Sequence, residues 1–180
     1  ISAKKNRELL KDIPYIPLLD LAICFYYPIS DAQIGKGTIL IHNSHMELWN
    51  TCLEELWKAA DQNTARMKPA ECIPIEHIML EMMGLTPEKK PEDDLPDLSG
   101  LPMYVLTNSE RSFGASVILY EHYLERIADR LRSDFYILPC SIHEVIIMPK
   151  SSGEDAAKLS DYSLVDVDEF MAEAFTNETI

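Results

Sequence analysis

The segment around residue 141 contains the residue types of a catalytic site, namely Cys140, Ser141, His143 and Glu144. A thiol or hydroxyl beside an imidazole and a carboxylate provides a nucleophile, a general base and a group that orients the base. In an extended chain, neighbouring side chains point to opposite faces, so Glu144 cannot orient the ring of His143. Ser141 and His143 share a face, but no oxyanion hole is evident from the sequence.

Two interpretations of this segment remain open. In the first, the protein is a hydrolase or transferase that uses Ser141 and His143, or Cys140 as the nucleophile, with a carboxylate from elsewhere in the chain. In the second, the segment is a turn between two strands, in which Ser141 bonds to the backbone and His143 is partly buried. We favour the turn, because the spacing does not bring the imidazole and the carboxylate of Glu144 together.

Three histidines are candidate metal ligands: His42 and His45, which are spaced i, i+3, and His122. If two similar halves of the chain packed together, His42 and His122 could approach each other. The chain has no HExxH motif and no His-x-His pair, which are typical of zinc sites. Gly35 and Gly37 lack the lysine and the third glycine of a phosphate-binding loop, and they fit a hairpin turn. We therefore expect ordinary surface or core histidines, with no metal and no other cofactor.

The elements that position the 140–144 segment are readable from the hydrophobic period. Apolar residues from Tyr123 to Leu131 recur at helical spacing and predict a helix. Short apolar runs bounded by turn residues or proline predict strands. The predicted strands are Met103–Leu106, Ser116–Tyr120, Phe135–Leu138 and Glu144–Met148. This order, β-β-α-β-β, predicts a helix on one face of a mainly antiparallel sheet.

The first part of the chain has a similar predicted order. A short helix over Ser2–Lys11 precedes two strands, Leu18–Tyr27 and Thr38–His42, which we expect to form a hairpin. Thr51 and Glu54 have the spacing of a capping box and predict the start of a helix. A further helix is predicted over Pro69–Gly84.

Three methionines of that last helix, Met79, Met82 and Met83, admit two interpretations. Methionine is flexible and polarizable, so a group of methionines can form an adaptable binding surface or fill irregular gaps in a core. We expect core filling.

The predicted fold class is α+β, with a mainly antiparallel sheet built from two β-hairpin-plus-helix units and with helices packed on one side. Residues 1–85 form the first unit with flanking helices, and residues 86–102 form a loop or linker rich in proline and acids. Residues 103–150 form the second unit, and residues 151–180 an acidic C-terminal helix. We expect one compact domain.

Composition excludes several classes of function. The net charge is −14 with a pI of about 4.7, and a field of that sign repels phosphate backbones, so nucleic-acid binding is not expected. No apolar run approaches the roughly 18 residues that span a bilayer, so no membrane association is expected. The four cysteines have no CxxC spacing, and three have apolar neighbours, which predicts reduced, buried thiols in a cytoplasmic protein.

Several motifs occur in an order that resembles a family of uncharacterised bacterial proteins, known only as a domain of unknown function. They are NRELLK at 6–11, LDLAI at 19–23, GTILI at 37–41, PMYVLTN at 102–108, GA at 114–115, FYILP at 135–139 and HEV at 143–145. The resemblance extends to about Lys150 and corresponds to the later part of that domain, because members extend further at the N-terminus. It implies a bacterial, cytoplasmic protein and supplies no activity. Similar proteins more often have two small hydroxyl residues where this chain has Cys140 and Ser141.

Three functions are compatible with the sequence. The preferred one is a non-enzymatic interaction or regulatory module. The sequence identifies neither its protein partner nor its oligomeric state. The first alternative is the hydrolase or transferase described above. The second is an acidic mimic of nucleic acid, which rests on the charge of −14 and requires the acids to gather on one face.

Overall fold

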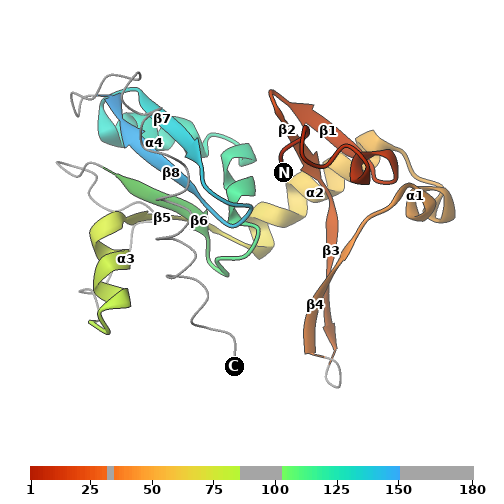
Figure 1. Ribbon diagram of the computed structural model, residues 1–180, viewed down its shortest axis with the longest axis horizontal. Coiled ribbons are helices and arrows are strands. Elements are labelled where there is room, and N and C mark those ends of the chain that lie inside the picture. Colours follow the sequence, from red (N-terminus) through yellow and green to blue (C-terminus); the bar gives the residue numbers. More distant parts are fainter. Residues whose placement is uncertain (32–34, 86–102, 151–180) are drawn as a thin grey trace. The chain divides into compact units, whose positions relative to one another are not determined.

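A computed structural model describes residues 1–31, 35–85 and 103–150 (Figure 1). The chain divides into two compact units, Ile1–Thr64 and a second unit that begins at Ala65. Both contain helices and antiparallel strands, which confirms the predicted α+β class. The predicted linker at 86–102 and the predicted helix at 151–180 lie outside the described residues. Within the described part of the chain, no helix is long and apolar enough to cross a membrane.

The first unit consists of two hairpins followed by helices. A 3-10 turn, η1, precedes the hairpin of β1 and β2; β3 and β4 then form a longer ribbon, in which Tyr26 pairs with Leu40. The bounds are η1 Leu9–Lys11, β1 Tyr15–Leu18, β2 Leu21–Cys24, β3 Tyr26–Asp31, β4 Gly35–Leu40, α1 Asn43–Trp49 and α2 Leu53–Met67. The last turn of α2, from Ala65, belongs to the second unit.

Three local predictions for this unit need correction. The predicted strand Leu18–Tyr27 is interrupted at Leu19, whose φ of 54° reverses the chain between β1 and β2. The predicted helix Ser2–Lys11 is helical only over Leu9–Lys11. At the start of α2, Glu55 takes the role predicted for Glu54, because its carboxylate accepts hydrogen bonds from the Thr51 hydroxyl and the Cys52 N–H.

The second unit is a four-stranded antiparallel sheet in the order β5-β6-β8-β7 (Figure 1). Its central strands, β6 and β8, are buried along their whole length. The bounds are β5 Ala70–Pro74, α3 Ile75–Met82, β6 Tyr104–Asn108, η2 Gly114–Leu119, α4 Tyr123–Leu131, β7 Phe135–Pro139 and β8 Val145–Pro149. The helix and the last two strands were predicted to within a few residues.

Both faces of this sheet are covered. One face presents Tyr104 and Leu106 of β6 to Val117 of η2 and to Tyr123 and Ile127 of α4. The opposite face presents Val105 of β6 and Ile73 of β5 to Ile78 of α3. Successive side chains of a strand point to opposite faces, so α3 packs against the side that α4 does not cover. The predicted placement of helices on one side therefore applies to η2 and α4 and not to α3.

Two elements of the second unit differ in type from the prediction. The predicted strand Ser116–Tyr120 is instead mostly part of the 3-10 helix η2, which places Val117 in the core with no exposed surface. Residues 70–74, predicted as the start of a helix, form β5, which pairs with β6 along its whole length. Pro74 then occupies the N-cap of α3, where its fixed φ suits the change from strand to helix. The sheet of the second unit therefore draws on residues that the prediction assigned to 1–85.

Candidate functional site

Ser141 lies in the turn between β7 and β8, and its hydroxyl is engaged within that turn. The hydroxyl donates to Glu144 Oε1 at 2.5 Å and accepts the backbone N–H of His143 at 2.8 Å. The Ser141 N–H donates to the carbonyl of Glu144 at 3.3 Å. Glu144 is 2% exposed, so the acceptor of the serine proton is a buried carboxylate and not an imidazole.

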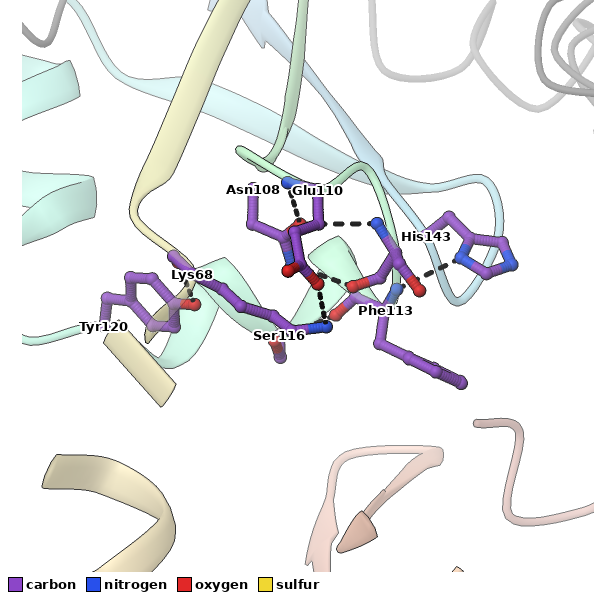
Figure 2. A network of polar contacts seen from close by, with 8 residues as sticks. Lys68, Asn108, Glu110, Phe113, Ser116, Tyr120 and His143 are labelled. Carbon is purple, nitrogen blue, oxygen red and sulfur yellow. Dashed lines mark hydrogen bonds and ion pairs between the residues drawn. The ribbon is translucent and has the colours of Figure 1, made fainter. Parts of the chain in front are cut away.

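The ring of His143 contacts the loop that follows β6. Its Nδ1 accepts the backbone N–H of Phe113 at 3.1 Å, and the two rings are 5.6 Å apart between centroids (Figure 2). A neutral imidazole has one donor and one acceptor nitrogen, so the proton of a neutral His143 lies on Nε2. In a serine triad, Nδ1 carries the proton and donates a hydrogen bond to a carboxylate. The observed contact gives Nδ1 the opposite role.

The backbone of the 140–144 turn is joined to β6 and η2. The carbonyl of His143 accepts the Thr107 hydroxyl at 2.8 Å, and the carbonyl of Ile142 accepts the N–H of Ala115 at 3.3 Å. Cys140 is half-buried, and its thiol donates to the carbonyl of Leu138 at 3.6 Å. These contacts hold residues 140–144 as a turn between β7 and β8.

Asn108, which has no exposed surface, shapes the loop after β6. Its Oδ1 accepts the backbone N–H groups of Glu110 and Ser112 at 3.1 and 3.3 Å, and its Nδ2 donates to the carbonyl of Ser112 at 2.9 Å. Asparagine commonly bonds to the backbone two residues further on in turns, so this role could have been read from its position at the end of a strand. The loop in turn presents the N–H of Phe113 to His143.

Lys68 is a buried cation that sequence reasoning missed. The residue is 7% exposed, and its ammonium bonds to the carboxylate of Glu110 at 2.8 Å (Figure 2). Its carbonyl accepts the hydroxyl of Tyr120 at 2.8 Å. A single lysine between Met67 and Pro69 carries no sequence signal for burial. The network of Lys68, Asn108, Glu110 and His143 joins the loop after β6 to both the start of β5 and the β7–β8 turn.

The structure does not bring the three histidines proposed as metal ligands together in a site within the described residues. His42 and His45 lie at the start of α1, where the His42 N–H donates to His45 Nδ1 at 3.0 Å and the His45 ring stacks on Trp49. His122 lies in the second unit, against Glu125 at 2.8 Å and Glu121 at 3.3 Å. The hydrogen bond and charge of Glu125, followed by the charge of Glu121, raise the pKa of His122. Among the described residues, no group of three or more His, Cys, Asp or Glu side chains could hold a metal ion.

All four cysteines are free thiols, in three kinds of surroundings. Cys72 is buried in the sheet, and its burial raises the pKa of the thiol to about 12. Burial also raises the pKa of the half-buried Cys24. Cys52, at the start of α2, is exposed. The thiols are thus less uniformly buried than the apolar neighbours in the sequence predict.

Comparison with protein-family models shows that the chain belongs to a family of unknown function, DUF5688, whose model matches residues 1–165. This confirms the resemblance to an uncharacterised family, and the match continues past Lys150. No curated protein matches the chain. No solved structure matches it either.

Proposed function

We propose that this chain is a non-enzymatic protein-interaction module, and that the 140–144 turn is part of its scaffold. The observation that carries the proposal is the contact of His143 Nδ1 with the Phe113 N–H, while the proton of Ser141 is directed to Glu144. A serine nucleophile requires a base that accepts its proton during attack. In this turn the candidate base serves a backbone amide instead.

The alternative, a hydrolase or transferase, would require a different arrangement of the same side chains. The ring of His143 would have to leave the Phe113 N–H and reach the hydroxyl of Ser141, which would itself have to leave Glu144. Of these groups Glu144 is the buried one, at 2% exposed, and a buried acceptor that loses its hydrogen bond costs about 1–3 kcal/mol. The described contacts therefore favour a structural role for both residues.

We also infer a bacterial cytoplasmic location. The four free thiols support it, because disulfides are rare in the reducing cytoplasm.

A pair of substitutions at His143 separates a structural from a catalytic role. The amide oxygen in His143→Asn can accept the Phe113 N–H, whereas His143→Phe has no acceptor. We expect His143→Asn to unfold close to the wild type in urea, and His143→Phe to lose about 1–2 kcal/mol of stability.

The same two variants are screened by thermal shift against metal ions, nucleotides, common metabolites and a chromogenic ester substrate. A compound that binds the folded state at 100 times its dissociation constant stabilises it by about 2.7 kcal/mol. We expect that no compound will stabilise the wild type and fail to stabilise both variants. Ester turnover, or a compound shift, that disappears equally in the Asn and Phe variants would replace the proposal with the hydrolase or transferase.

A further inference from the structure

The apolar stripe of α3 is longer than the core that it covers. Ile75 and Ile78 pack against Ile73 and Val105. Met79 and Met82 continue the same helical stripe, yet they are 42% and 43% exposed. Met83 and Leu85, which follow directly, are 69% and 55% exposed. The structure therefore corrects the expectation that these methionines fill the core.

The methionine surface is defined as Met79 and Met82 at the end of α3 together with Met83 and Leu85 directly after it, and α3 is an anchored helix. Arg111 forms two hydrogen bonds to the carboxylate of Glu81, at 2.8 and 3.1 Å. The first helical N–H, that of Ile75, donates to the carbonyl of Met103 at 3.2 Å. A surface held in place before binding loses less conformational entropy when a partner docks. The side chains on it remain adaptable, as methionine surfaces are in proteins that bind varied helices.

Charge indicates the kind of partner. Glu76 is exposed on α3. The whole chain has a net charge of −14, which accelerates the approach of cationic partners and repels anionic ones. The chain's own last segment, from 151 to 180, is itself acidic and is disfavoured as an occupant for that reason.

We propose that the methionine surface of α3 binds an amphipathic helix of a partner protein, with lysines or arginines flanking the apolar stripe of that helix. An exposed apolar stripe on a helix fits another helix that presents residues at i, i+3, i+4 and i+7. This inference rests on the proposed interaction function and names its surface and the chemistry of its partner.

The test uses the full chain and two synthetic helical peptides with the same leucine stripe, one with lysines on its polar face and one with glutamates. Binding is measured by fluorescence anisotropy in 0.15 M salt, with the peptide labelled. We expect the lysine peptide to bind and the glutamate peptide not to bind. We expect Met82→Gln and Met79→Gln each to weaken the lysine peptide at least about tenfold in Kd, equivalent to about 1.4 kcal/mol.

Two control variants make the result specific to this surface. Met82→Leu keeps an apolar side chain of similar volume and should bind within about threefold of the wild type, since such swaps are well tolerated. Leu48→Gln removes a leucine that is 79% exposed in the first unit, and it should leave Kd unchanged. Equal Kd values for the wild type, Met79→Gln and Met82→Gln would show general attraction to an acidic protein and overturn the proposal. Absence of binding by the lysine peptide would also overturn it.

A third variant tests whether the chain's own residues 151–180 occupy the methionine surface. Phe170→Gln with Met171→Gln, in the full chain, removes apolar side chains from the 151–180 segment. We expect no change in Kd for the lysine peptide. A tenfold or greater gain would mean that this segment occupies the surface, and the proposal would fail. Either failure leaves the results for His143→Asn and His143→Phe unaffected, so the two proposals are tested separately.

Discussion

Among the four thiols, Cys72 and Cys52 have the most different surroundings. Cys72 is 4% exposed with a pKa of about 12, whereas Cys52 is exposed at the start of α2. The thiolate is the form that reacts with disulfide reagents, so we expect Cys52 to react first and Cys72 only after unfolding. Ellman's reagent at pH 8, followed by peptide mass spectrometry, measures both. Labelling of Cys72 in the folded protein at the rate of Cys52 would contradict the packing of β5.

His122 is the histidine whose titration the structure predicts. Its pKa is raised above the ordinary 6.5 by the hydrogen bond that its ring donates to Glu125 and by the charges of Glu125 and Glu121. A pKa raised by folding means that protonation stabilises the folded state. That contribution is present below the unfolded pKa and is lost as pH rises through the folded pKa. Because the side chain is exposed, its effect on stability is small and screened by salt.

An NMR titration of the five histidines tests this directly. We expect the pKa of His122 to lie above the ordinary value and to fall in Glu125→Gln. The wild-type protein, titrated in parallel, is the control. A midpoint for His122 that does not respond to Glu125→Gln would show that the contact with Glu125 is absent in solution.

At the level of single residues, sequence reasoning identified the 140–144 turn but not what holds it. The Glu144 carboxylate accepts the Ser141 hydroxyl. The partner of the His143 ring, the Phe113 N–H, lies 30 residues earlier, and pairing over such a separation depends on the fold. The burial of Lys68 was unpredictable for the same reason, since Glu110 and Tyr120 reach it from elements further along the chain.

At the level of elements, Gly114 determines how closely η2 approaches the sheet. A Cβ at this position would collide with the Thr107 hydroxyl and the carbonyl of His143, and it would lie 2.8 Å from the backbone nitrogen of Asn108. Two of these three atoms belong to backbone and cannot move away cheaply. We therefore expect Gly114→Ala to destabilise the second unit by about 3 kcal/mol, at the upper end of overpacking costs.

Urea unfolding with Gly37→Ala as the matched control measures this effect. Gly37 lies in β4, and a Cβ there would meet nothing within 4 Å. A surface substitution of this kind should change stability by no more than about 0.5 kcal/mol. If the two alanine variants unfold alike, η2 does not pack under β6 as described.

The elements also show which sequence signals succeed. The period of α4 and the proline-bounded strands β7 and β8 were predicted because local pattern and tertiary packing agree. Residues 116–120 contain Val117 and Ile118, which favour strands locally. The left-handed conformation of Phe113, φ 55°, and the burial of Val117 instead lead the chain into a 3-10 helix. β5 was missed because its five residues run directly into α3.

At the scale of the whole molecule, the contacts within the chain group it into two compact units, and the expectation of one compact domain stays a prediction. The core clusters around Tyr104 and Val105 consist of residues beyond Ala65 only. Both tryptophans, Trp49 and Trp57, lie in the first unit, where Trp57 packs edge-on against Phe25. Tryptophan fluorescence therefore reports the unfolding of the first unit, while amide hydrogen exchange in β6 and β8 reports the unfolding of the second.

This division predicts that each unit unfolds separately, because stability is a property of contiguous packed regions. Gly114→Ala should speed amide exchange in β6 and β8 and leave the urea midpoint of tryptophan fluorescence unchanged. Ile13, in the first unit, is 2% exposed, so Ile13→Ala leaves a cavity in the core. It should lower the urea midpoint of tryptophan fluorescence by the equivalent of about 2–5 kcal/mol. The rate of amide exchange in β6 should stay unchanged. If either substitution moves both signals together, the units unfold as one cooperative body, and the boundary near Thr64 has no thermodynamic meaning.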